Sequence, residues 1–93
     1  MATKEMVNQS SSFDLAEVKK LVDNATSARN KAEAKPYIER LDFLQATADI
    51  KPYTRNVFGE LIGFVKPASG RVKDKAHWLK GVKAWLYKLE TSL

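Results

Sequence analysis

Residues 71–93, RVKDKAHWLKGVKAWLYKLETSL, carry the clearest hydrophobic pattern in the chain. Seven apolar residues follow one another there at intervals of three or four positions: Val72, Ala76, Leu79, Val82, Leu86, Leu89 and Leu93. This spacing is typical of the inner seam of a helical bundle or coiled coil, because it keeps the side chains on one face of an α-helix. The sequence therefore predicts one helix from about residue 71 to residue 91.

A capping pattern marks the start of an earlier helix in the stretch FDLAEV, residues 13–18. Asp14 is a good N-cap, and Glu17, three residues later, can complete a capping box. Apolar residues then recur at spacings of three and four, which indicates an amphipathic helix. We expect this helix to run to about residue 30.

Prolines indicate the starts of two more helices. Proline suits the first turn of a helix, where its missing N–H would have no partner, and Pro36 and Pro52 each precede an apolar-periodic segment. Asp49 can cap the helix that begins near Pro52, and we expect Pro67 to end that helix.

These four segments predict an all-α protein, and the fold we expect is a small up-down four-helix bundle, since short connections make neighbouring helices antiparallel. The alternative is a three-helix bundle in which the first two helices form one long helix kinked at Pro36. Residues 1–11 are polar and serine-rich and are expected to be a disordered tail. Residues 12–93 would then form a single helical-bundle domain.

The composition of the 93-residue chain excludes several classes of function. The absence of cysteine removes disulfides, thiol catalysis and cysteine-ligated zinc. His77 is the only histidine, and its expected neighbours are lysines on a solvated face. No carboxylate cluster has metal-ligand spacing, and there is no phosphate-cradling glycine loop. We therefore expect no enzymatic activity, no cofactor and no metal.

The first residues, MATKEMVNQSSS, lack the apolar segment of a secretory signal. No run approaches the roughly 20 apolar residues that span a bilayer, so we expect no transmembrane segment. The expected location is intracellular, cytoplasmic or nuclear, rather than secreted.

The formal net charge of +5 is unevenly spread along the chain. Residues 1–50 contain seven Lys and Arg against eight Asp and Glu, a balance of −1, whereas residues 51–93 contain nine against three, a balance of +6. An anionic partner for the second half is therefore physically reasonable.

Two tryptophans in the last helix are the main candidates for a binding site. At about 100° per residue, Trp78 and Trp85 lie two turns apart on one edge of the apolar seam. Aromatic residues with one solvated end are enriched at protein interfaces, although both rings could instead complete the core. The candidate partner-binding residues on this helix are Trp78, Gly81, Trp85, Lys80, Lys83 and Lys88.

Gly59 and Gly63 are a second candidate feature. They lie one turn apart in FGELIG, and each costs about 1 kcal/mol relative to alanine inside a helix. Such a pair permits close helix packing, or it leaves a notch that admits a side chain or helix of a partner. In the second case these glycines would form the other wall of the binding site.

The stretch RVKDKAHWLKGVKAWLYKLET, residues 71–91, resembles the last helix of the BAG domain. BAG domains are helical co-chaperone modules that contact the ATPase domain of the major heat-shock chaperone. The resemblance implies a co-chaperone role. In that family an Arg, followed two turns later by a Gln, makes polar contacts with the partner. Lys75 and Lys83 are the residues of this sequence nearest to those two positions.

The function that the sequence favours is a non-enzymatic adaptor or regulatory module. It would bind another protein through the aromatic and lysine-rimmed edge of its last helix, and the lysines would steer an acidic partner. Binding of a nucleic acid or an anionic lipid by the basic second half is the alternative, and the last helix also resembles a basic, aromatic-anchored calmodulin target. Self-association through the same edge is a variant of the first hypothesis.

Overall fold

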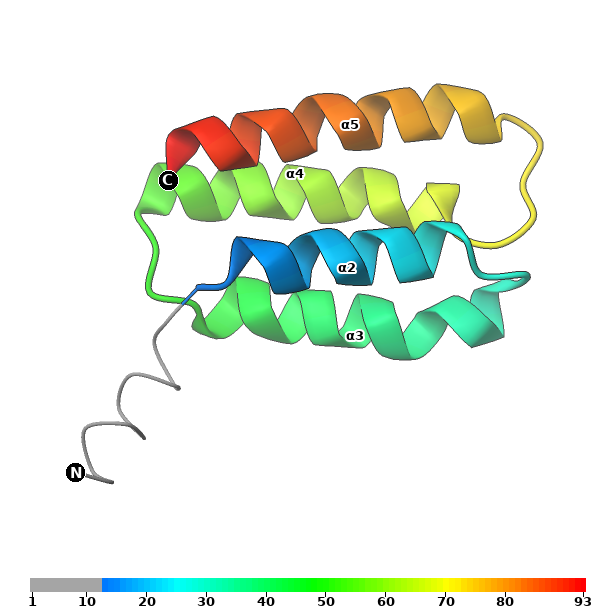
Figure 1. The fold of residues 1–93 in the computed structure, drawn as a ribbon, viewed down its shortest axis with the longest axis horizontal. Helices are drawn as coiled ribbons and strands as arrows, with labels where there is room; N and C mark the ends of the chain where they lie inside the picture. Colours follow the sequence, from blue (N-terminus) through cyan, green and yellow to red (C-terminus); the bar gives the residue numbers. More distant parts are fainter. Residues whose placement is uncertain (1–12) are drawn as a thin grey trace.

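The computed structural model describes residues 13–93, which form four α-helices with no strand among them: α2 (Leu15–Thr26), α3 (Lys31–Thr47), α4 (Pro52–Ala68) and α5 (Lys75–Ser92). Successive helices run in opposite directions (Figure 1). The predicted up-down four-helix bundle is therefore confirmed. The three-helix alternative is wrong, because the chain reverses direction between α2 and α3. The tail predicted at residues 1–11 lies outside the described residues.

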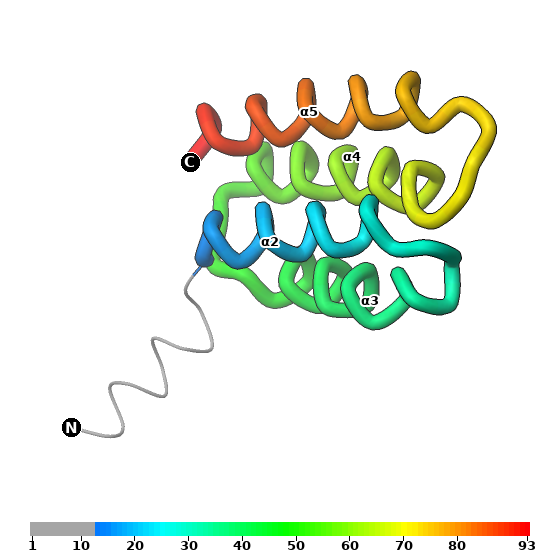
Figure 2. Tube along the Cα trace, turned by 45° about the vertical axis from the view of Figure 1, so that its right-hand side comes forward, coloured from blue at the N-terminus to red at the C-terminus, as the bar shows by residue number. Residues whose placement is uncertain are grey.

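The bundle consists of two helical hairpins, α2 with α3 and α4 with α5 (Figure 2). The α4–α5 pair has the most extensive contact, and α4 also touches α2 and α3. The core takes side chains from every helix. Its largest fully buried apolar members are Phe58, Leu41, Leu61, Leu89, Val18 and Val65.

Asp14 caps α2 as predicted, but the predicted capping box does not form, because the Glu17 carboxylate bonds to Arg40 rather than to the Asp14 amide. The Asp14 carboxylate accepts hydrogen bonds from the amides of Ala16 and Glu17, at 3.0 and 3.3 Å. The Glu17 carboxylate accepts from Arg40 of α3 at 2.9 Å, so it joins two helices. Phe13 packs edge-on against Phe58 of α4, with 5.5 Å between ring centroids.

The boundary between α2 and α3 differs from the prediction. α2 ends at Thr26, and α3 begins at Lys31, five residues before Pro36. Asn30 is the N-cap, and its side-chain oxygen accepts from the Glu33 amide at 2.8 Å. The Glu33 carboxylate in turn accepts from the Arg29 amide at 2.9 Å. This Asn-x-x-Glu pattern is itself a helix-start signal and outweighs the preference of proline for a first turn.

Arg55 fixes the turn between α3 and α4. Its guanidinium donates to the carbonyls of Gln45 and Ala48 at the end of α3, and the Gln45 side chain donates back to the Arg55 carbonyl at 3.3 Å. Pro52 occupies the first position of α4 as predicted, but the N-cap is Lys51 rather than Asp49. The helix also continues through Pro67 to Ala68.

Gly70 brings the two connections at the opposite end of the bundle together. It has φ 75°, and a Cβ there would lie 2.9 Å from the carbonyl carbon of Asn30 and 3.0 Å from the Lys31 nitrogen. Any other residue would strain the backbone and collide with the α2–α3 connection. Glycine is therefore needed for the close approach of these two loops.

The last helix is shorter than predicted, because α5 begins at Lys75 rather than near residue 71. Within α5 the seam is buried at Val82 and Leu89 and partly buried at Leu79 and Leu86. Ala76 is exposed. Each spacing of three falls about 60° short of a full turn, so two such steps carry Ala76 about 120° away from Val82.

Two glycine-to-alanine substitutions should change stability in opposite directions. Gly63→Ala should raise the free energy of unfolding by about 0.5–1 kcal/mol, because an added Cβ meets no atom within 4 Å and alanine favours the helix. Gly70→Ala should lower it by more than about 1 kcal/mol through backbone strain and collision. Urea unfolding followed by circular dichroism measures both. A Gly70→Ala variant as stable as the parent protein would contradict this account of the connections.

Candidate functional site

Trp78 and Trp85 are both partly buried and pack against the hydrophobic core from one side of α5. Seven residues separate them, so they lie two turns, or about 10.5 Å, apart along the helix axis. Each indole therefore has one side against the core, while part of its surface remains accessible.

Phe64 of α4 lies on the same side of the bundle as the two tryptophans. Its ring lies over Gly81, where a Cβ would approach within 3.0 Å even of the Phe64 Cγ atom. The Phe64 and Trp78 rings are tilted against each other, with 5.9 Å between centroids. Gly81 thus permits an aromatic contact between α4 and α5, and such pairs contribute about 0.5–1.5 kcal/mol beyond area burial. The sequence analysis did not identify Phe64 as a site residue. Phe64 and Gly81 belong to different helices, so their contact can be known only once the pairing of α4 with α5 is known.

Tyr53 extends this row of aromatic residues toward the other end of α4. It is 63% exposed and lies only about 20° around the helix from Phe64, since eleven residues make nearly three full turns. The Thr54 hydroxyl donates to the Ser92 carbonyl at 3.0 Å, which holds this end of α4 against α5. We call Tyr53, Phe64, Trp78, Gly81 and Trp85 the aromatic edge.

Of the three predicted lysines, Lys88 borders an indole. Its ammonium nitrogen lies 4.4 Å from the centroid of the Trp85 ring, a cation–π contact. Lys80 and Lys83 are exposed. Each lies two positions from a tryptophan, about 160° around α5 from it, and so occupies the other side of the helix.

Gly59 and Gly63 are not brought together with the tryptophans. A Cβ on Gly59 would lie 3.5 Å from the side-chain nitrogen of Gln45, so this glycine faces α3. Gly63 is exposed and faces open space. The two glycines lie about 100–140° around α4 from Phe64, and the second wall of the aromatic edge is Phe64 itself.

His77 contacts Trp78 edge-on, with 5.1 Å between ring centroids, and is exposed. Within residues 13–93, no three His, Asp or Glu side chains gather closely enough to hold a metal ion. None of the four described helices has the length and apolar character needed to cross a membrane.

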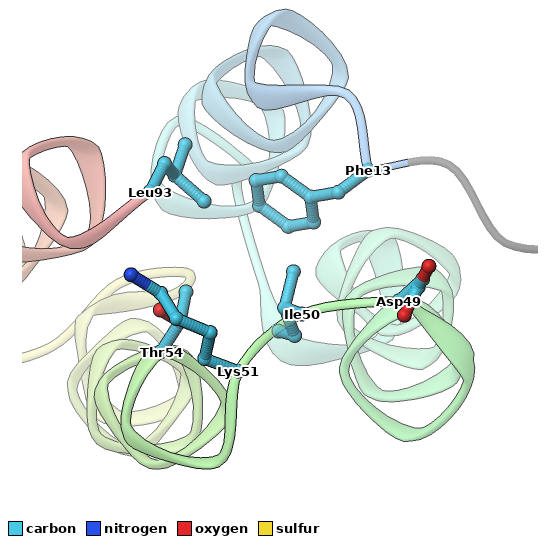
Figure 3. A pocket seen from close by; sticks show the side chains of 6 residues that line it. All are labelled: Phe13, Asp49, Ile50, Lys51, Thr54 and Leu93. Atoms are coloured by element: carbon cyan, nitrogen blue, oxygen red, sulfur yellow. The ribbon is translucent and has the colours of Figure 1, made fainter.

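A cavity of about 380 Å³ lies at the end of the bundle where α2 begins and α5 ends. Phe13, Ile50 and Leu93 surround it, and Asp49 stands at its margin (Figure 3). The Thr54 hydroxyl on its wall is already engaged with Ser92. Lys51 also lines the cavity, and both Lys51 and Asp49 are exposed. The rest of the lining is largely apolar, so the cavity lacks a buried, convergent set of polar groups for chemistry.

Comparison of the chain with protein-family models, curated proteins and solved structures finds no match. The resemblance of residues 71–91 to a BAG helix stays a prediction from that stretch alone.

The contact between Gly81 and Phe64 can be tested by adding a methyl group. Gly81→Ala should be less stable than Gly63→Ala by about 1–3 kcal/mol, because both gain helix propensity but only the first forces the Phe64 ring to move. The fluorescence of Trp78 should change at the same time. Urea unfolding and emission spectra provide the measurement, and Phe64→Leu in the same chain should relieve the loss. Equal stability of the two alanine variants would show that Phe64 does not pack on Gly81.

Proposed function

We propose that this protein is a non-enzymatic module that binds an acidic amphipathic helix of a partner protein along the aromatic edge. The observation that carries the proposal is the partial exposure of Phe64, Trp78 and Trp85 on one side of the α4–α5 hairpin. Aromatic anchors that are half-covered in the free protein gain most from burial by a partner.

The geometry of the α4–α5 pair supports a helix as the bound element. An amphipathic helix docks on an apolar surface through anchors at i, i+3 or i+4, and i+7. The rise of about 10.5 Å between Trp78 and Trp85 equals the i to i+7 repeat of a partner helix. Gly81 lies between the two tryptophans along α5, and because it has no side chain the Phe64 ring of α4 packs over it.

The charge of α5 supports an acidic partner. The helix contains four lysines and one glutamate, and Glu90 is paired with Lys19 of α2 at 3.1 Å. Lys88 lies at the margin of the aromatic edge. The remaining lysines would raise the rate of encounter with an acidic segment without entering the buried contact.

Trp85 should be more important for binding than for folding. We expect Trp85→Ala to weaken binding of a designed glutamate-rich amphipathic peptide, with leucines at i, i+3 and i+7, by at least tenfold, about 1.4 kcal/mol. Tyr87→Ala is the matched control, because Tyr87 is 67% exposed on the opposite side of α5, and it should change affinity less than twofold. Tryptophan fluorescence reports binding in both variants, from Trp78 alone in Trp85→Ala and from Trp78 and Trp85 together in Tyr87→Ala. Loss of 3–5 kcal/mol of stability in Trp85→Ala would identify a core tryptophan and refute the proposal.

The alternative function is binding of a nucleic acid or anionic lipid, and it is favoured by Lys80 and Lys83. Both are exposed, and neither forms an ion pair with the part of the chain that the structure describes. A surface of this kind acts through charge alone and gives affinities that fall steeply with salt.

Salt dependence separates the two functions. Between 50 and 200 mM salt, affinity for the acidic peptide should fall by less than about tenfold, since only steering and rim contacts are screened. Binding of single-stranded DNA, measured in parallel by fluorescence anisotropy, should be weak and should collapse over the same range. Tight, salt-resistant DNA binding, or a dimer by sedimentation that buries the tryptophans, would contradict the proposed partner.

A further inference from the structure

The net positive charge of the chain is concentrated at one end of the bundle. The connections α2–α3 and α4–α5, together with the first turns of α3 and α5, comprise residues 27–34 and 69–76 (right-hand end in Figure 1). They contain five Lys and Arg against Glu33 and Asp74, a balance of +3 out of the +5 of the whole chain. The opposite end, residues 13–17, 48–55 and 88–93, contains three Lys and Arg against four Asp and Glu, a balance of −1. The tertiary structure thus joins cations that lie about forty residues apart in the sequence.

A cavity of about 260 Å³ lies between these two connections. It exists because Gly70 lets the α4–α5 connection lie against the backbone of Asn30 and Lys31. The residues that line it are Ala28, Arg29, Gly70, Arg71, Val72 and Lys75. It therefore has cationic side chains from both hairpins and an otherwise small, apolar lining.

The cations around the cavity have unused hydrogen-bond donors. Arg29 is held by the Glu33 carboxylate at 2.8 and 3.1 Å, and this pairing lowers the pKa of Glu33. Arg71 makes no side-chain hydrogen bond and no ion pair within residues 13–93. Lys75 donates once, to the Gly70 carbonyl at 2.6 Å, which leaves two of its N–H groups free.

The backbone of the α4–α5 connection adds further donors. The amides of residues 70–73 donate no hydrogen bond to the rest of the described chain. The first turn of α5 also lacks a side-chain cap, because the Asp74 carboxylate accepts no bond from it. The wall of the cavity thus has donors from side chains and nearby free amides, and none of its lining side chains is acidic.

We propose that this cavity binds a phosphate monoester group. A phosphate monoester carries a charge of about −1.5 to −2 at pH 7 and three strong acceptor oxygens, which suits a region of net charge +3 with several free donors. The planar guanidinium of Arg71 can bind two of these oxygens at once, and Lys75 can bind a third. The volume lies below the roughly 300–1,000 Å³ of sites for drug-sized ligands, so the cavity fits the phosphate group rather than a whole nucleotide.

Titration with inorganic phosphate in chloride buffer, followed through the amide resonances of the protein, tests the site. We expect saturable shifts confined to residues 28–31 and 69–76, with a dissociation constant on the order of 1 mM. Arg71→Gln combined with Lys75→Gln should weaken binding at least tenfold. The matched control is Lys80→Gln combined with Lys83→Gln, which removes the same charge from exposed sites farther along α5 and should change binding less than threefold.

Arg71→Gln alone guards against misfolding, because Arg71 is exposed and makes no side-chain hydrogen bond or ion pair within residues 13–93, and it should already weaken binding several-fold. Equal loss in the cavity and control variants, or shifts that do not saturate, would overturn the proposal, since either result indicates binding by net charge alone. Phosphoserine in solution and phosphatidylcholine vesicles with phosphatidic acid then distinguish the two sources of a phosphate monoester. The compound that supplies the phosphate group should compete with inorganic phosphate, and its binding should be lost when Arg71 and Lys75 are replaced.

Discussion

Burial of α4 is the interaction on which the rest of the bundle depends. This helix has seven buried residues, from Thr54 to Ala68, more than any other helix, and its contact with α5 is the most extensive between any two helices. A domain of this size buries a smaller fraction of its surface than a larger one, so its core must be shared by every element. The other helices are positioned by the need to cover α4 from different sides.

The two ends of α4 are then fixed by different means. At its start Arg55 reaches the last carbonyls of α3, which closes one connection with charge-assisted hydrogen bonds. At its end Lys31 donates to the Lys66 carbonyl at 2.8 Å, and Gly70 places the following loop against the α2–α3 connection. Backbone contact therefore brings two basic loops together, and this proximity creates the proposed phosphate site.

The aromatic edge follows from the same arrangement. α5 covers α4 with Val82 and Leu89, which are buried, so its indoles lie beside the seam rather than at its centre. Phe64 fills the space above Gly81 from the opposite helix. The tryptophans are supported by the core yet keep accessible surface, which is the arrangement expected of anchors for a partner.

The sequence by itself determined the helical class, the cap at Asp14 and the seam from Leu79 to Leu89, because these depend on spacing within one helix. It left three or four helices open, and the reversal of the chain between α2 and α3 decided for four. It missed the start of α3, since Pro36 was weighted above the Asn30 and Glu33 pair. Only the tertiary structure decided that Phe64 meets Gly81, that Gly59 faces α3, and that Arg29 and Arg71 share one cavity. Such contacts join residues of different helices or connections, and the pairing of helices is fixed by packing of the whole core rather than by any local pattern.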